Sequence, residues 1–592
     1  MPKRGFIFNS ISRKRVKRNA FNLSYENKLT CNMNRLIPFF TNDVIPNDTF
    51  KVKNEYIMKT QPLIAPIMHR VDITQHYFFV PLRLIWSDFE RFITGGVYGT
   101  DSPSHPYFTC GLLNEFLTAL SGYYDSWFTD AESKQKYVQD DSNSYWRLFT
   151  AVLDKYNELL SLLDYLGYPF SRYEGITMVY NTDDNYTEYT FADLDENQHF
   201  SSLRIRAYYF IYDNYYVDQN VGSKLFSDEW RDNSGDDLSY IYMVVSNHDC
   251  LCHRAWKKDY FTSAMPWQQR GPVVTVGGNA PVTMNGKTGQ RFVYMGSGHP
   301  EIADTVVGAD SDGFLSNLEQ SVDGSNVVNT DGVQLNFDPN GTLQAQLSFD
   351  INDLRRSNAL QRWLERNMTS GARYVEQILA HFGIKPKDYR LQRPEYLGGG
   401  KQPFTISEVV QTSSTDSESP QANQAGNGHG YNQQHVFSRT FDEHGLILGL
   451  LSIMPRASYQ QGLDRMLVKF DKLDWAFPEF GNLGEQPVYS KELFFTKDGN
   501  SGNDEIFGYQ SRYAEYKYNF DQVHGDFKDT LKFWHLGRIF ANRPLLNDSF
   551  IASDASKRVF AVEDERQDCL LFDIYNDVTV LRALPAYGTP AL

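Results

Sequence analysis

Residues 69–86, HRVDITQHYFFVPLRLIW, limit the fold more than any other stretch of the chain. Apolar residues at 71, 73, 77 and 79 alternate with polar residues at 70, 72, 74 and 76, which is the two-residue period of a β-strand with one apolar face. Phe78 and Val80 then make both faces apolar, and Pro81 ends the ladder. We therefore expect a strand that starts half-exposed and runs into the core of a β-sheet protein.

Two histidines in this stretch raise the question of a metal site. His69 and His76 are seven residues apart, and an odd spacing on a strand puts side chains on opposite faces. They cannot share one metal ion unless a bulge separates them. We interpret both as hydrogen-bonded strand histidines.

Helical spacing is confined to a few segments. Apolar residues at 148, 152, 156, 159 and 163 predict a helix over 145–166, which Gly167 and Pro169 end. A second helical pair is predicted in 353–383, with a break at 369–371 and a stop at Gly383. Residues 570–582, LLFDIYNDVTVLR, predict a terminal strand.

Three long segments look like elaborations of the fold rather than its core. Residues 273–345 are rich in Gly, Asn, Asp and Ser and contain repeated turn dipeptides such as Asp312-Gly313 and Asn340-Gly341. Residues 411–435 are poor in apolar side chains and predict a mobile or extended loop. Residues 173–200 form an acidic, Tyr-rich insertion. Many strands, few helices and long loops favour a β-sandwich or jelly roll.

The charge is divided between a basic N-terminus and an acidic body. Residues 1–18 hold seven basic residues and no acidic one, although the whole chain of 592 residues has a net charge of −16. Such an arm suits contact with a polyanion or, alternatively, a solvated terminus. The basic residues are Lys3, Arg4, Arg13, Lys14, Arg15, Lys17 and Arg18.

No motif carries a catalytic or metal-binding signature. HDCLCH at 248–253 has a C-x-C pair without a second ligand pair, so we interpret Cys250 and Cys252 as core residues. GGGK at 398–401 lacks the glycine and the Ser or Thr of a phosphate-binding loop. Five scattered cysteines fit a reducing compartment rather than a disulfide framework. The longest apolar run, 446–454, is too short to span a bilayer, and the basic N-terminus lacks the apolar segment of a secretory signal. We expect no enzyme, cofactor, metal site or membrane insertion.

Several long motifs resemble one protein family. They are FNLSYENKLTCNMNRLIPFFTNDVIPNDTFKV at 21–52, PLIAPIMHRVDITQHYFFVPLRLIWSDFERFITGG at 62–96, RAYYFIYDNYYVDQN at 206–220, KKDYFTSAMPWQQRGP at 257–272, FGYQSRYAEYKY at 507–518 and the ending LRALPAYGTPAL. In this order they closely resemble the major capsid proteins of gokushoviruses, small single-stranded DNA phages of the microvirus family. The resemblance covers most of the chain outside the three elaborations, and the 173–200 insertion departs from the family pattern.

The resemblance implies a mainly β fold, a single eight-stranded antiparallel jelly roll with long inserted loops and a few helices. It implies a basic arm at 1–20 and a capsid domain at 21–592, assembled as sixty copies in a T=1 icosahedral shell around circular single-stranded DNA. The insertion at 273–345 would project near the three-fold axes and meet a host surface receptor. Further implied partners are virion proteins such as a pilot protein and a scaffolding protein, and the implied location is the virion, assembled in the bacterial cytoplasm.

Two groups of residues are candidates for contacts in such a particle. The seven basic residues of the arm would neutralise phosphates without reading sequence, or the arm would clasp a neighbouring subunit. Arg512, Tyr513, Tyr516 and Tyr518 suit a subunit interface or a base-stacking surface, or alternatively a core strand with a charged edge. The alternative function is a carbohydrate-binding or carbohydrate-active β-sandwich protein, whose Tyr- and Asp-rich loops would hold sugars.

Overall fold

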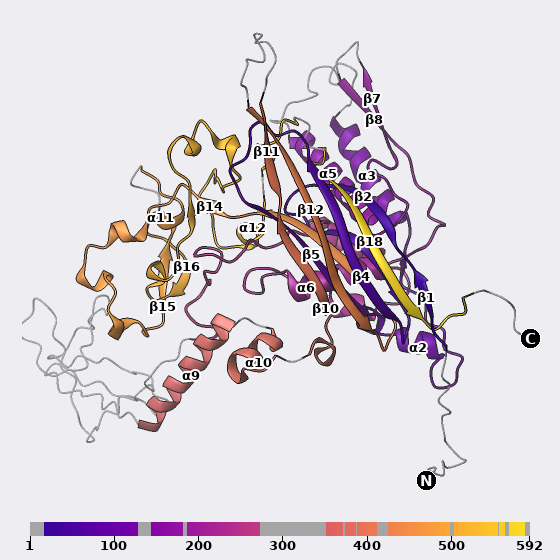
Figure 1. The fold of residues 1–592 in the computed structure, drawn as a ribbon, viewed down its shortest axis with the longest axis horizontal. Helices are drawn as coiled ribbons and strands as arrows, with labels where there is room; N and C mark the ends of the chain where they lie inside the picture. The colour runs from indigo at the N-terminus through magenta and orange to yellow at the C-terminus, as the bar shows by residue number, and fades with distance from the viewer. Residues whose placement is uncertain are drawn as a thin grey trace, which may run out of the picture. The chain divides into compact units, whose positions relative to one another are not determined.

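The computed structural model describes residues 17–127, 144–181, 186–272, 351–370, 373–385, 387–410, 424–497, 502–554, 556–562 and 567–586 (Figure 1). The chain divides into two compact units, residues 1–268 with 368–592, and residues 269–367. In the second unit the described residues include most of α9 (Ile351–Ser370).

Two antiparallel sheets form the centre of the first unit. The six-stranded sheet has the order β1-β18-β4-β12-β11, and β2 also pairs with β18 (Figure 1). Its strands are β1 (Asn19–Asn22), β2 (Tyr25–Cys31), β4 (Thr49–Thr60), β11 (Thr405–Val410), β12 (Gln424–Thr440) and β18 (Leu570–Arg582). The four-stranded sheet has the order β10-β5-β13-β3, with β3 (Ile37–Val44), β5 (Val71–Pro81), β10 (Glu395–Pro403) and β13 (Gly445–Pro455).

Alternation along β4 shows which face of the six-stranded sheet is inside. Phe50, Val52, Tyr56 and Met58 are buried, whereas the residues between them include exposed Lys51, Lys53, Ile57 and Lys59. Aromatic side chains of the two sheets meet in the core. The ring centroids of Tyr77 in β5 and Phe437 in β12 are 6.0 Å apart, and those of Phe79 in β5 and Phe441, just after β12, are 4.5 Å apart. The six-stranded sheet therefore has one buried apolar face and one solvent-exposed face, as antiparallel sheets often do.

The four-stranded sheet is covered on both faces, because helices pack on its far side. Phe78 of β5 contacts the ring of Tyr215, the last residue of α6, at 4.7 Å. The helices of this region are α1 (Leu82–Ile85), α2 (Phe89–Thr94), α3 (Gly111–Trp127), α5 (Ser144–Tyr165), α6 (Leu203–Tyr215), α7 (Asp228–Asp232) and α8 (Leu238–Asn247). The result is a helical layer and two sheet layers, with all of β13 buried.

This helical layer overturns one expectation about β5. The strand and its core-facing residues 71, 73, 77 and 79 are confirmed, but the predicted half-exposed start is wrong. Asp72 and Thr74 are buried, because β10 and β13 flank β5 and its second face is covered too. His69 lies before the strand, so only His76 is a strand histidine.

Other predicted elements can be compared directly. The helix at 145–166 is confirmed as α5, the pair in 353–383 as α9 and α10 (Tyr374–Phe382), and the terminal strand as β18. Residues 424–435 lie in β12 and pair with β4 and β11, so the loop predicted over 411–435 is wrong for this part. Residues 411–423 and 273–345 lie outside the described part of the chain.

The Tyr-rich segment at 173–200 contains a hairpin. Its strands are β7 (Ile176–Asn181) and β8 (Tyr186–Phe191), which form a two-stranded sheet in the described part of the chain. The segment ends at β9 (Phe200–Ser201), which pairs with β6 (Tyr107–Phe108). Tyr189 packs in the core against Phe149 of α5 at 5.1 Å, so at least one tyrosine of this segment is a packing residue.

A second, smaller core is formed by the connection between β13 and β18 together with the segment that follows α8. It joins Tyr260 and Phe261 with Tyr459, Phe507 and Phe550. The short elements around it are β14 (Ser458–Tyr459), β15 (Glu485–Tyr489), α11 (Ser490–Leu493), β16 (Ile506–Ser511), β17 (Asp521–Gln522) and α12 (Asp548–Ile551). This subdomain gives the chain a surface that is independent of the two large sheets.

Candidate interaction surfaces

The basic arm is described only at its end. Lys3, Arg4, Arg13, Lys14 and Arg15 lie outside the described residues, while Lys17 is exposed. The Arg18 guanidinium donates to the carbonyl oxygen of Asn47 and to the hydroxyl of Thr49, both at 3.0 Å. Arg18 therefore fixes the point where the arm leaves the six-stranded sheet, at the turn between β3 and β4.

The four residues of the SRYAEYKY motif do not share one surface. Tyr513 adopts the left-handed conformation and is only 7% exposed, whereas Tyr516 and Tyr518 are 44% and 56% exposed. The Arg512 guanidinium lies 4.8 Å from the Tyr513 ring centroid. The segment follows β16 and contains a 3₁₀ turn, η5 (Ala514–Tyr516), so the alternative of a core strand is wrong. Tyr516 and Tyr518 remain the candidates for contact with another molecule.

Beneath Tyr516 lies a buried charge network that the sequence did not reveal. The Lys469 ammonium pairs with Glu515 at 2.9 Å and lies 3.9 Å from the Tyr516 ring centroid. Gln486 donates to the same carboxylate at 2.6 Å. Although burial opposes it, the hydrogen bonds from Lys469 and Gln486 lower the pKa of Glu515 below its usual range. These contacts fix the position of the exposed Tyr516 ring.

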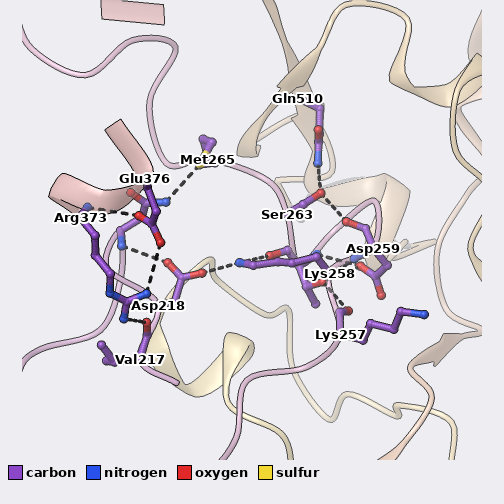
Figure 2. A network of polar contacts seen from close by, with 12 residues as sticks. Val217, Asp218, Lys257, Lys258, Asp259, Ser263, Met265, Arg373, Glu376 and Gln510 are labelled. Atoms are coloured by element: carbon purple, nitrogen blue, oxygen red, sulfur yellow. Dashed lines mark hydrogen bonds and ion pairs between the residues drawn. The ribbon is translucent and has the colours of Figure 1, made fainter. Parts of the chain in front are cut away.

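The KKDYFTSAMPWQQRGP motif ties loops together (Figure 2). The Asp259 carboxylate accepts from the backbone N–H groups of Phe261 and Thr262, at 3.0 and 2.8 Å. Lys258 forms an ion pair with Asp218, and Gln510 of β16 donates to the Ser263 hydroxyl at 2.6 Å (Figure 2). The motif therefore holds segments far apart in sequence in one arrangement, which is a structural role.

The RAYYFIYDNYY motif contributes a fully buried ion pair. Arg206 of α6 contacts Asp237 through two bonds of 2.8 and 2.5 Å, and neither side chain is exposed. The same guanidinium donates to the carbonyl oxygens of Ile85 and Asn233 at 2.9 and 3.0 Å. It thereby connects α1, α6 and the segment between α7 and α8. The sequence signal for this site was an arginine among the aromatic residues of the α6 motif.

His76 lines a cavity of about 840 Å³ on the helical side of β5. One ring nitrogen lies 2.8 Å from the Tyr216 hydroxyl, and Tyr396 packs against the ring at 5.6 Å. Burial, together with the positive charge of Arg254, lowers the pKa of His76 to about 4. Its neutral imidazole is a packing and hydrogen-bonding group. His69 instead lies 2.8 Å from the carbonyl oxygen of Arg456, so both histidines are hydrogen-bonded as predicted.

The remaining motifs have structural positions. Cys250 and Cys252 belong to the main core, as predicted, although their segment is not a regular strand. GGGK lies in β10, directly beside β5. Among the described residues, no cluster of three His, Cys, Asp or Glu side chains is arranged to hold a metal ion. Within the same residues, no helix combines the length and the apolar content needed to cross a bilayer.

Comparison with known proteins gives a consistent result. A family model described as capsid protein (F protein) matches residues 9–123 and 179–592. Capsid protein VP1 of Chlamydia phage 1 is 32% identical, with 99% of this chain and 97% of that protein aligned. Capsid protein VP1 of Bdellovibrio phage phiMH2K is 31% identical over 97% of this chain and 95% of its own. Capsid protein VP1 of Spiroplasma virus 4 is 26% identical over 98% and 96%.

These matches agree with the resemblance found in the motifs and cover nearly the full length of each protein. They make the chain a structural component of a small phage virion that assembles with copies of itself, and not an enzyme. The carbohydrate-active alternative is therefore wrong. The chain belongs to the phage capsid protein (F protein) family.

Proposed function

We propose that the chain is the repeating subunit of a closed T=1 shell of sixty copies, built on a single eight-stranded jelly roll and enclosing single-stranded DNA. The observation that carries the proposal is the strand order. When β1 and β2 are counted as one strand and β11 is left aside, the main strands in chain order pair as 1-8-3-6 in one sheet and 2-7-4-5 in the other. Successive strands thus cross repeatedly between two sheets, which is the pattern of the jelly rolls found in viral capsids.

The two long connections of this jelly roll supply the surfaces for assembly. Residues 82–394 between β5 and β10 carry the helical layer, and residues 456–569 between β13 and β18 carry the small second core. The described first-unit residues of each connection pack into a hydrophobic core. Packed surfaces of this kind suit obligate interfaces, which are larger and more apolar than transient ones.

We assign the basic arm to the genome inside the shell. Its basic side chains would neutralise phosphates in a sequence-independent way, and this contact would weaken with salt. The arm joins the six-stranded sheet at Arg18, which donates hydrogen bonds to Asn47 and Thr49. Replacing Lys3, Arg4, Arg13, Lys14 and Arg15 by Gln leaves this anchor intact. We expect such particles to assemble but to protect less DNA from nuclease, and unchanged packaging and salt sensitivity would refute the DNA role.

The insertion at 273–345 is assigned to the outside of the particle, where it would meet a host receptor. Its turn-rich composition carries few apolar groups for a shell interface. We expect particles with a shortened insertion to form normally and to attach poorly to host cells. If shortening stops assembly while the subunit stays folded, the insertion is an interface element instead.

The shell would be completed by other virion proteins, a pilot protein and a scaffolding protein among them, in the bacterial cytoplasm. All five cysteines are buried free thiols, which suits assembly in a reducing compartment. Co-purification of particles from cells that express the chain with and without its neighbouring virion genes would identify these partners.

Electron microscopy of the purified protein, combined with nuclease treatment, tests the proposed function directly. We expect closed, uniform icosahedral particles that contain nuclease-resistant single-stranded DNA when the phage genome is present. Open sheets, filaments or a protein that remains monomeric at assembly concentrations would refute the closed shell.

A further inference from the structure

The connection from β14 to β15 exposes an unusual number of large apolar side chains. We call residues 464–483 the apolar loop. Six of its apolar side chains are between 43% and 90% accessible, with Phe470 at the upper limit: Leu467, Phe470, Leu473, Trp475, Phe477 and Leu483. Large apolar side chains that are exposed together in one segment mark an interaction surface.

Local caps give the apolar loop a defined conformation. It contains three 3₁₀ turns, η2 (Arg465–Val468), η3 (Lys472–Asp474) and η4 (Pro478–Phe480). The Asp464 carboxylate accepts from the N–H of Met466 at 2.9 Å, and that of Asp474 accepts from the N–H of Asp471 at 2.9 Å. The aromatic side chains are thus presented by an ordered backbone, which lowers the entropy lost on binding.

The base of the apolar loop is fastened to the second core. Arg465 pairs with Glu492 at 2.9 Å and donates to the carbonyl oxygen of Pro487 at 2.6 Å. Lys469 pairs with Glu515 and lies over Tyr516, as described above. The exposed Tyr516, predicted from the sequence as an interface residue, therefore contacts the base of the apolar loop through Lys469.

A second exposed apolar surface has the complementary charge. The α10 surface, residues 374–385 and 387–390, exposes Tyr374, Leu379, Phe382 and Ile384 by 51% to 75%. Its acids are already paired, Glu376 with Arg373 at 3.4 Å and Asp388 with Arg393 at 3.5 Å. The exposed cations of this surface are Lys385, Lys387 and Arg390. The outer part of the apolar loop, 470–483, instead has the acids Asp471, Asp474 and Glu479 against a single Lys472.

The α10 surface is also fixed in place. Arg373, at the start of α10, donates to the carbonyl oxygen of Asp213 at 2.9 Å and to that of Val217 at 3.1 Å, and Figure 2 shows the second of these bonds. Gly383, at the end of α10, adopts φ +67° and closes the helix. Both surfaces are therefore ordered in the isolated subunit, and both have apolar centres with charged edges, as protein interfaces do.

We propose that the apolar loop of one subunit docks on the α10 surface of the next subunit in the shell. A second copy of the chain is the occupant because the protein assembles with itself, and because the acidic edge of one surface matches the basic edge of the other. The contact joins two different patches, so it is heterologous and generates a ring that closes around a symmetry axis. The inference rests on the proposed shell and names one of its contacts.

Site-directed cross-linking of assembled particles tests this contact. The five native cysteines are buried, so a short bis-maleimide would react first with introduced thiols. Particles carrying both Phe470→Cys and Phe382→Cys in every chain should give a ladder of dimers, trimers and higher species on a denaturing gel. Particles carrying either substitution alone should give monomers, and a mixture of the two single variants should give dimers only.

The controls separate this inference from the shell itself. Val179 of β7 is an equally apolar residue that is 54% exposed, and Val179→Cys with Phe382→Cys should not cross-link. Dimers from Phe470→Cys alone would mean that two apolar loops meet each other, which overturns the proposal. Uncross-linked subunits in intact particles would overturn it too, whereas failure of the unmodified chain to form closed particles would refute the proposed shell.

A charge reversal gives a second test that does not depend on introduced thiols. Glu479→Lys should reduce particle yield about tenfold while the soluble subunit keeps its unfolding temperature. Adding Lys387→Glu to the same chain should restore the yield, because every heterologous contact then has its charges exchanged. If the double variant assembles no better than Glu479→Lys alone, and Lys387→Glu alone assembles normally, the α10 surface is not the partner.

Discussion

At the scale of single residues, the buried charges of this chain are positioning groups. Arg206 satisfies Asp237 and two backbone carbonyl oxygens in a site that water does not reach. A buried ion pair of this kind contributes little net stability compared with apolar residues of similar size. Removing one partner, however, leaves the other as an unpaired buried charge, which is strongly destabilising. The value of the pair lies in fixing how α1, α6 and the segment before α8 meet.

Arg206→Ala should therefore lower the free energy of unfolding of the isolated subunit by about 3–5 kcal/mol, because Asp237 would be left buried without its cation. The matched control is Arg231→Ala, whose ion pair with Asp228 lies at the surface, and which should cost less than about 1 kcal/mol. Denaturant unfolding of both variants measures the difference. Equal effects would show that the buried pair has no special role.

His76 makes the stability of the subunit depend on pH. Its pKa is 6.5 in the unfolded chain and about 4 in the folded one, so below pH 6.5 the unfolded state binds a proton that the folded state does not. The stability of the wild type should fall by at most about 3 kcal/mol as the pH drops from 6.5 to 4. His76→Phe should show a smaller loss of stability than the wild type over this range. An unchanged slope in His76→Phe would contradict the assignment.

At the scale of elements, close approach between strands explains two glycine-rich segments. A Cβ on Gly399 would collide with the backbone carbonyl oxygen of Gln75 in β5 and would lie 2.9 Å from the ring of His76. A Cβ on Gly428 in β12 would lie 2.9 Å from the ring of Phe404. Glycine in these strands is required by packing and not by a bound phosphate.

Gly399→Ala should destabilise the subunit by about 3 kcal/mol, because the added methyl group meets backbone that cannot move without separating β10 from β5. Gly122→Ala is the control: it lies within α3, where a Cβ would meet nothing within 4 Å. That substitution should stabilise the subunit by about 0.5–1 kcal/mol through helix propensity. Thermal unfolding of both variants would decide the point, and a neutral Gly399→Ala would contradict the close approach.

The same elements show how far sequence patterns reach. Periodicity found α5, α9, α10 and β18 because their apolar positions repeat within one element. It failed for residues 424–435 of β12, because the buried positions there are Gly426 and Gly428, and the first buried apolar side chain of the strand is Phe437. It also failed for the second face of β5, because that face is covered by α6, which lies more than a hundred residues away in sequence.

The surfaces were harder to predict than the fold. Tyr513 and Tyr516 lie three residues apart in one motif, yet Tyr513, which has a left-handed backbone, is buried and Tyr516 is exposed. The apolar loop resembles core sequence, and only the structure shows that its side chains face outward. Burial depends on contacts between distant segments, so a single sequence cannot distinguish a core residue from an interface residue.

At the scale of the whole molecule, the subunit combines a packed core with surfaces that leave large apolar side chains exposed. The two sheets and the helical layer bury a large continuous core. Three surfaces lie outside this core: the solvent-exposed face of the six-stranded sheet, the apolar loop and the α10 surface. A chain with such exposed apolar groups is suited to assembly and is poorly suited to remain a monomer at high concentration.

The copy number of the particle tests the proposed shell most directly. Mass spectrometry of intact, DNA-free particles should give a protein mass of about 4 MDa, because sixty chains of 68.2 kDa form one closed shell. A protein that stays near 68.2 kDa, or particles whose mass corresponds to another number of subunits, would contradict the T=1 shell.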